Sequence, residues 1–152
     1  MKPSKIDTIK ESLAADWLPE IYRTKIRSGR TRSYNLDIAK RESRPEIQYT
    51  LLGIELKVGR KRFACPDLST ARYLRVFARL GCTVFAVPYD ISTISTIADE
   101  LETAWQRAVL LLTKKDTDAD RSKLIKAMRD EINAVGPGDA MPRFDRSTKQ
   151  RP

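Results

Sequence analysis

The stretch IQYTLLGIELKV, residues 47–58, constrains the fold more than any other part of the sequence. It is rich in β-branched and other aliphatic residues, many of which favour strands. Because alternate residues of a strand point to the same side, Leu52, Ile54, Leu56 and Val58 form one apolar face. The pattern predicts a strand with that face in the core and a polar face opposite it.

A helix pattern and a second strand pattern follow. After a GRK turn and a short RFAC strand, residues 68–80 place apolar side chains at helical spacing, with Asp67 as a natural N-cap and Gly81 closing the helix. CTVFAVPY, residues 82–89, is almost unbroken in apolar character, as in a strand covered on both faces. The order strand, helix, strand predicts a right-handed crossover with the two long strands roughly parallel.

The rest of the chain divides into helical patterns, one further strand pattern and a basic segment. Helical spacing predicts a first helix over 5–18, a helix over 94–112 and a last helix that ends near Val135. SYNLDIA, residues 33–39, alternates like a half-buried strand. RTKIRSGRTRS, residues 23–33, has five cations and a glycine without an apolar period, which predicts a loop or a mobile arm.

Together these patterns predict one α/β or α+β domain over residues 1–135, with a small mixed sheet flanked by helices. The aperiodic segment 136–152 is expected to be a disordered basic tail. No apolar run approaches the ~20 residues of a membrane helix, and the N-terminus lacks the apolar region of a signal peptide. We therefore expect a cytoplasmic protein without a membrane partner.

Residue types that are absent exclude several kinds of chemistry. The 152 residues include no histidine, which removes Ser-His and Cys-His nucleophile pairs and histidine-bound zinc. The two cysteines, Cys65 and Cys82, are too few for a disulfide framework or a cysteine-only zinc site, and we expect buried thiols. Any catalysis has to use carboxylates, lysine, tyrosine or a hard cation held by oxygen ligands.

The positive charge is concentrated in one part of the chain. Residues 23–79 contain 15 Lys or Arg and 5 Asp or Glu, a local charge of +10, whereas the rest of the chain carries −1 of the net +9. A localised basic region is typical of proteins that bind polyanions. We therefore expect nucleic acid, as duplex or branched DNA, to be the partner.

A possible catalytic group lies on the polar face of the 47–58 strand. Glu55 and Lys57 are two residues apart and project to the same side, next to the open space at Gly53. A carboxylate that binds Mg²⁺ and an amine near the attacked phosphate are what metal-assisted phosphodiester hydrolysis needs. Asp37 would supply a second carboxylate if the two strands lie side by side. The alternative is that Glu55 and Lys57 form a charge pair on a solvated face.

This order of elements resembles the PD-(D/E)XK nuclease superfamily, which has the restriction-endonuclease-like fold, and within it the archaeal Holliday-junction resolvases. The match covers residues 5–90: an N-terminal helix, a strand with Asp37 in NLDI, a strand with Glu55 and Lys57 in IELK, then a short strand, a helix and an apolar strand. Asn35 and Leu36 precede the aspartate where the family often has proline, so the PD half is degenerate. The helices after residue 92 lie outside the match.

The resemblance implies a Mg²⁺- or Mn²⁺-dependent DNA endonuclease. In that case Asp37 and Glu55 are metal ligands, Lys57 is the catalytic lysine, and Glu11 or Glu20 could add a further acidic ligand. Two alternatives stay open: a non-catalytic DNA- or RNA-binding protein on the same fold, and an adaptor whose basic face meets an acidic protein.

The cations expected to contact nucleic acid fall into three groups: the basic arm, the turn after the 47–58 strand, and one face of the 68–80 helix. On that helix three arginines line up opposite the apolar arc, and we expect that no acid offsets them. The long apolar stripe of the 94–112 helix could also be a homodimer surface. The predicted nucleic-acid contacts are Arg23, Lys25, Arg27, Arg30, Arg32, Arg60, Lys61, Arg62, Arg72, Arg75 and Arg79.

Overall fold

The fold is mixed α+β and contains two small antiparallel sheets, as a computed structural model that describes residues 4–112 and 118–138 shows. The predicted fold class is confirmed, although the strands form two sheets instead of one mixed sheet. The elements of the helical part are α1 (Lys5–Leu13), a 3₁₀ turn (Ala14–Asp16), α2 (Leu18–Ile21), a π-helical turn (Tyr22–Ile26), α3 (Leu68–Leu80), a 3₁₀ turn (Ile91–Thr93), α4 (Ile94–Leu110) and α5 (Asp118–Val135). The strands are β1 (Thr31–Asn35), β2 (Glu46–Thr50), β3 (Gly53–Val58), β4 (Lys61–Cys65) and β5 (Val84–Pro88).

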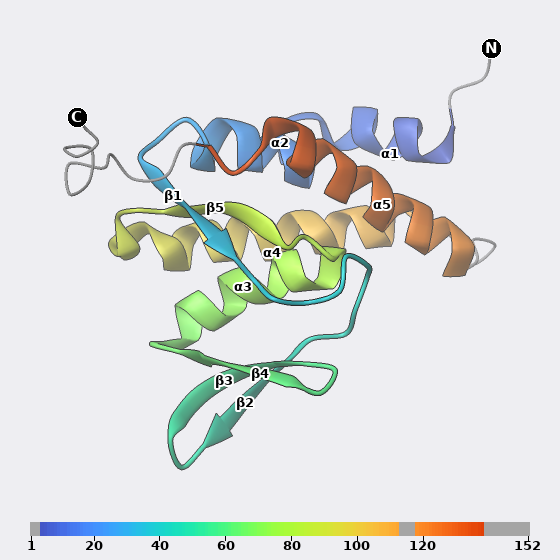
Figure 1. The fold of residues 1–152 in the computed structure, drawn as a ribbon. Helices are drawn as coiled ribbons and strands as arrows, with labels where there is room; N and C mark the ends of the chain where they lie inside the picture. The colour runs from blue at the N-terminus through green and yellow to red at the C-terminus, as the bar shows by residue number, and fades with distance from the viewer. Residues whose placement is uncertain (1–3, 113–117, 139–152) are drawn as a thin grey trace, which may run out of the picture.

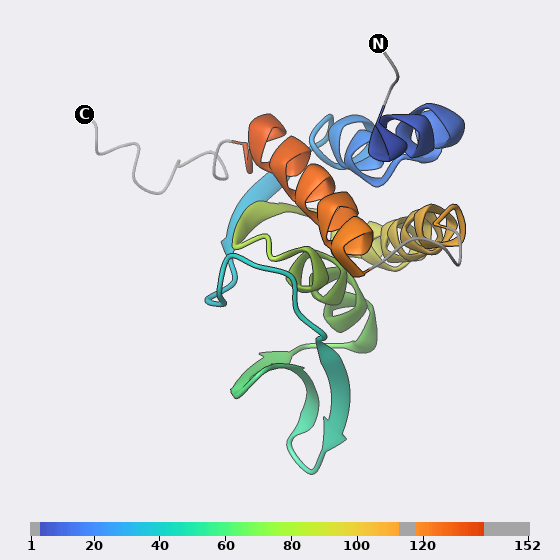
Figure 2. The same ribbon diagram turned by 90° about the vertical axis from the view of Figure 1, so that its right-hand side faces the viewer.

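The two sheets lie on different sides of α3 (Figure 1). β1 and β5 form a two-stranded sheet among the helices, whereas β2, β3 and β4 form a meander that projects from the helical body, away from α1 and α5 (Figures 1 and 2). The inner face of the meander packs on α3 through residues that include the fully buried Leu56. Within the described residues, the meander is therefore the part that projects from the helical body (Figures 1 and 2).

The predicted parallel crossover is wrong, because β3 and β5 belong to different sheets. β5 pairs antiparallel with β1, with Ala86 opposite Ser33, and has no second strand beside it in the described part of the chain. Two buried tyrosines take the place of that strand. The Tyr22 hydroxyl accepts from the Ala86 N–H, and the Tyr73 hydroxyl donates to the Ala86 carbonyl. The apolar character of β5 thus reflects burial in a helical core, not a central place in a large sheet.

Local signals at the ends of elements were predicted more accurately than strand pairing. Asp67 accepts a hydrogen bond from the Thr70 N–H at the start of α3, and Gly81 closes the helix with a φ of 79°. The predicted strand over 33–39 lies instead at Thr31–Asn35, and the expected single strand over 47–58 is interrupted by a turn at Leu51 and Leu52. The first shift follows from pairing with β5, about fifty residues away, whereas the second is a local hairpin in which β2 pairs with β3.

The predicted helix over 5–18 ends early, at Leu13. Ala14 takes a positive φ of 49°, a conformation that breaks the helix. Pro19 then stands in the first turn of α2, where its missing N–H costs nothing, so it starts a helix instead of ending one. At the other end of the domain, residues 136–138 of the predicted tail are ordered against the body, because the Gly136 carbonyl accepts from Tyr22 and Arg27. The remaining tail, 139–152, lies outside the described residues.

Candidate nucleic-acid interface

Residues 36–45, which we call the basic linker, connect β1 to β2 and cross the C-terminal end of α3. Ser43 anchors it there: its hydroxyl donates to the Ala78 carbonyl at 2.7 Å and its N–H to the Arg79 carbonyl at 3.3 Å. A Cβ atom at Gly81 would lie 2.5 Å from the backbone of Arg41, so the two backbones touch directly. This anchoring sets the positions of Arg41 and of Arg44, one residue after Ser43.

Beside the linker, the β3–β4 turn completes a basic hollow of about 660 Å³. We call this hollow the cationic groove and define it by Arg41, Arg44, Arg60 and Lys61; Glu42 is the only acid among the lining residues. The side chains of the three arginines make no hydrogen bond or ion pair with any residue that the structure describes. Their guanidinium groups are therefore available to an external anion.

Lys61 ties the turn to the linker. Its ammonium group lies 3.0 Å from the Asp37 carboxylate and donates to the Asp37 carbonyl at 2.9 Å. Asp37 follows the end of β1 and its side chain is 87% exposed. The interaction pairs the first of the two carboxylates that were predicted to bind metal with a cation.

The second carboxylate, Glu55, lies on the outward face of β3. Lys57 shares that face and stands opposite Arg62 of β4 and Glu46 of β2. The Glu55 Oε1 atom lies 3.8 Å from the Arg62 guanidinium, and it is buried without a hydrogen-bond partner. The ion pair of Glu55 across the strands is thus with Arg62, and not with Lys57 as the alternative explanation of the Glu-x-Lys motif expected.

The arrangement that a shared metal ion requires is not formed. β1 pairs with β5 and β3 with β2 and β4, so Asp37 and Glu55 do not come from neighbouring strands. Among the residues 4–112 and 118–138, no group of three or more Asp, Glu, Cys or His could hold a metal ion. The charged group next to the unsatisfied Glu55 oxygen is the Arg62 guanidinium, which repels a cation. The donor set therefore does not fit Mg²⁺ or Mn²⁺.

The two further acids suggested as ligands, Glu11 and Glu20, lie on the helical side of the molecule. They line a hollow next to Trp17, far along the molecule from the meander (Figure 1). Glu20 is paired with Arg23, and the hydrogen bond from that guanidinium lowers the pKa of the Glu20 carboxyl. Neither acid joins Asp37 or Glu55.

The three arginines of α3 face α4 and are paired with its acids. Arg72 contacts Asp99, while Arg75 and Arg79 both approach Glu102. The premise that no acid offsets these arginines is wrong, because the acids come from another helix. Their guanidinium groups stabilise the packing of two helices and are not exposed as a row of phosphate contacts. Burial, together with the nearby cations, lowers the pKa of Arg79.

The predicted basic arm is largely built into the fold. Arg23 and Lys25 lie in the π-helical turn and pair with Glu20 and Glu100, so the segment is neither a loop nor a mobile arm. Arg27 donates to the Gly136 carbonyl. Further along, Arg30 lies over the ring of Tyr89, and Arg32 is an exposed residue of β1 that has no side-chain partner in the described part of the chain.

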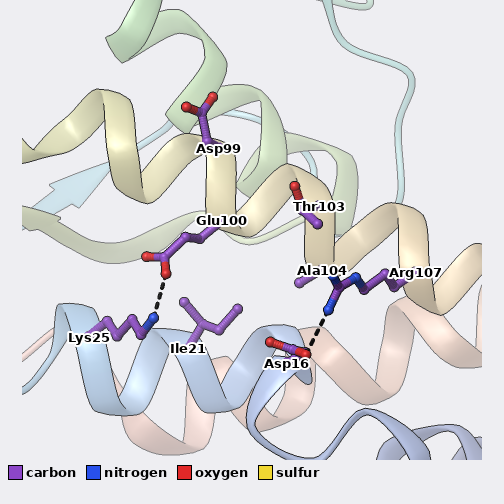
Figure 3. Close-up of a pocket in the computed structure, with 8 residues that line it drawn as sticks. All are labelled: Asp16, Ile21, Lys25, Asp99, Glu100, Thr103, Ala104 and Arg107. Carbon is purple, nitrogen blue, oxygen red and sulfur yellow. Dashed lines mark hydrogen bonds and ion pairs between the residues drawn. The ribbon is translucent and has the colours of Figure 1, made fainter.

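A second hollow, between the α2 region and α4, has a mixed charge (Figure 3). Two ion pairs cross it, Lys25 with Glu100 and Arg107 with Asp16. With Asp99 also in its lining, acids outnumber cations there, so this hollow is unsuited to a polyanion.

The groove residues Arg41 and Arg44 are not among the contacts predicted from the sequence. The segment KRESRPE, residues 40–46, has three cations in its first five residues, which is a signal visible in the sequence. What could not be seen is that this segment rests on the end of α3 beside the β3–β4 turn, because this contact joins residues about forty positions apart.

Comparisons with protein-family models, curated proteins and solved structures found no match. Within the described residues, none of the helices combines the length and the apolar character needed to cross a membrane. Function is therefore inferred from the residues themselves.

Proposed function

We propose that the protein binds the sugar–phosphate backbone of nucleic acid, with duplex DNA as the preferred form, through the cationic groove. The observation that carries this proposal is the location of Arg41, Arg44 and Arg60 and their lack of side-chain partners among the described residues. They converge on one hollow, whereas most other arginines of the basic region are paired or packed. A guanidinium group can bind a phosphate through two parallel hydrogen bonds.

The lining of the groove favours contacts to phosphates over contacts to bases. Its other residues are small or aliphatic, with Ile38, Ala39 and Val58 among them, and it contains no aromatic side chain. Proteins that bind single strands without sequence preference stack bases on aromatic rings, which the groove does not provide. Backbone contacts alone position a duplex and depend strongly on salt.

The test compares two variants that lose the same charge. In Arg41→Gln/Arg44→Gln/Arg60→Gln the groove loses three cations, and in Lys10→Gln/Arg107→Gln/Lys126→Gln three exposed, ion-paired cations are lost elsewhere. By fluorescence anisotropy with a labelled duplex, we expect the groove variant to bind at least tenfold more weakly, roughly the loss of a few phosphate contacts. The control variant should stay within about twofold of the wild type. Equal weakening by both variants, or no binding by the wild type at low salt, would contradict the proposal.

Hydrolysis of the bound DNA remains a prediction from the sequence. Incubation of plasmid and branched DNA with the protein and Mg²⁺ or Mn²⁺ tests it, with Glu55→Gln as the control. Because the donor set does not fit either metal, we expect no cleavage above background. Cleavage that depends on Glu55 would show that the site rearranges when DNA binds.

A further inference from the structure

The tip of the β2–β3 hairpin exposes large apolar side chains. Leu51 is fully exposed, Leu52 is 96% exposed and Tyr49 is 71% exposed. Among the described residues these are three of the most exposed large hydrophobic side chains, and they lie within four positions of one another. Since burying a leucine is favourable by roughly 1.5–3 kcal/mol, a pair of leucines held in water at the end of a projection indicates a surface that a partner covers.

Hydrogen bonds close the tip. Thr50 and Gly53 face each other across the hairpin, and the Thr50 hydroxyl accepts from the Leu52 N–H and donates to the Gly53 carbonyl, both at 3.1 Å. Gly53 takes a positive φ of 126°, and neither leucine does. The chain therefore turns at Leu51 and Leu52 without backbone strain at either leucine. The hydrogen bonds of the turn limit the ordering entropy that is lost when a partner covers the leucines.

Charge is distributed unevenly along the meander. Residues 47–54, which surround the tip, contain no charged side chain, whereas the cations Lys57, Arg60, Lys61 and Arg62 all lie toward the opposite end. The six residues of β3 separate the two ends by roughly 20 Å at 3.3 Å per residue. This length matches about six base pairs of a duplex at 3.4 Å per pair.

We propose that Leu51 and Leu52 form a wedge that enters between stacked bases of the duplex held at the cationic groove. This inference rests on the proposed function and adds how the protein deforms its DNA. Apolar side chains that insert at a base step unstack it and bend the duplex. Steps of a pyrimidine followed by a purine unstack most readily, so the wedge selects these steps although the groove reads no bases.

The same spacing argues against the other partners of an apolar tip. If the leucines entered a lipid surface, the cations of the meander would lie roughly 20 Å from the headgroups, beyond the screening length of about 8–10 Å in physiological salt. A second copy of the chain would need an interface of about 1,000 Å² or more, and the tip is a narrow point. A duplex that runs along the meander contacts both the leucines and the cations.

The test uses a duplex in which 2-aminopurine is the purine of a central pyrimidine–purine step. The fluorescence of 2-aminopurine rises when this base unstacks. Wild-type protein should raise the signal severalfold, and Leu51→Ser/Leu52→Ser should abolish the rise and weaken binding by roughly tenfold. The matched control is Leu110→Ser/Leu111→Ser, which changes two exposed leucines at the end of α4 and should behave as the wild type. Both variants change exposed side chains, so thermal melts should be unaltered.

The outcomes separate the wedge from the groove. If the wild type binds the duplex but the 2-aminopurine signal stays flat, or if the tip variant retains the full signal, the wedge is wrong and groove binding stands. If the wild type does not bind, the proposed function itself is wrong. If the wild type binds phosphatidylglycerol vesicles and the tip variant does not, the wedge is wrong and the tip enters a membrane surface. If the wild type forms a concentration-dependent dimer that the tip variant does not form, the wedge is wrong and the tip contacts a second copy.

Discussion

Gly81 links the end of α3 to the basic linker. Its φ of 79° is one that residues with a side chain rarely adopt, and the Arg41 backbone occupies the space where a Cβ would be. A helix-closing glycine was predictable from the sequence, because the signal is local. The close approach of the linker was not, since nothing in the residues around Gly81 indicates what packs on it. This one residue therefore positions both the helix end and the arginines of the groove.

We expect Gly81→Ala to lower the free energy of unfolding by about 3 kcal/mol or more, since it adds a steric clash to the cost of a left-handed conformation. Gly59→Ala is the matched control: Gly59 also has a positive φ, 62°, but nothing lies within 4 Å of the position of a Cβ atom. Gly59→Ala should lower the free energy of unfolding by only about 1 kcal/mol. Urea denaturation measures both. Equal losses would mean that the linker moves aside without cost.

Between elements, pairs of charges hold α3 against α4. Arg75 and Arg79 share Glu102, and Arg79 also lies over the ring of Trp105. The helices and their apolar arcs were predictable from periodicity, whereas this pairing joins residues 23 to 27 positions apart. The arginine row was therefore assigned to phosphate binding, and the structure assigns it to packing. The sequence pattern indicated a row of arginines on α3 but not the α4 acids that neutralise them.

We predict that Glu102→Gln destabilises the protein by about 3 kcal/mol, because it leaves two partly buried guanidinium groups without their counter-charge. Asp99→Asn, which removes the exposed partner of Arg72, should cost less than about 1 kcal/mol. Chemical denaturation of the two variants gives the comparison. If Asp99→Asn lowers the free energy of unfolding more than Glu102→Gln does, the pairing of Glu102 with Arg75 and Arg79 is not the main electrostatic contact between α3 and α4.

The pairing of the strands could not be predicted from the sequence as well as the buried faces of the strands could. Of the four residues predicted to face the core, Leu56 and Val58 do so and Ile54 is partly buried, whereas Leu52 is 96% exposed, because the turn before β3 takes it out of the strand. The partner of β5 was predicted wrongly, because β1 and β5 are separated by about fifty residues, and two tyrosine hydroxyls bind the Ala86 backbone in place of a second strand. The metal hypothesis required the strand before Asp37 to lie beside β3, and β1 pairs with β5 instead.

At the scale of the whole molecule, several acids of the core are held in their neutral form. Burial raises the pKa of the Cys82 thiol from its ordinary value near 9 to about 12, and raises the pKa values of the Tyr22 and Tyr73 hydroxyls. Both cysteines are free and buried, as predicted. These groups ionise more readily in the unfolded chain than in the folded protein, so alkaline solution favours unfolding.

We therefore expect full stability below about pH 9 and a progressive loss between pH 9 and 12. Each buried group contributes at most about 1.4 kcal/mol per pH unit within the interval between its unfolded and folded pKa. Urea midpoints measured from pH 8 to 11 should fall, and fall less steeply in Cys82→Ala, which has one ionisable group fewer. Midpoints that stay constant to pH 11 would contradict the burial of these groups.

The meander projects from the helical body (Figure 2). The cationic groove lies between its β3–β4 turn and the linker, whereas the arginines of α3 are paired with acids of α4. The concentration of positive charge in residues 23–79 was visible in the sequence. Which of those cations stay free depends on packing between distant segments, and so the groove became visible only in the fold. The proposed function depends on those free cations.

The most direct test of that claim is the dependence of duplex binding on salt. A plot of log Kobs against log[NaCl] has a slope of about −0.9 for each phosphate that the protein neutralises, so the three groove arginines predict a slope near −2.7 or steeper. Arg41→Gln/Arg44→Gln/Arg60→Gln should reduce its magnitude by about 2.7, and the variant that loses Lys10, Arg107 and Lys126 should keep it. An unchanged slope in the groove variant, or a flat plot for the wild type, would contradict backbone binding in the groove.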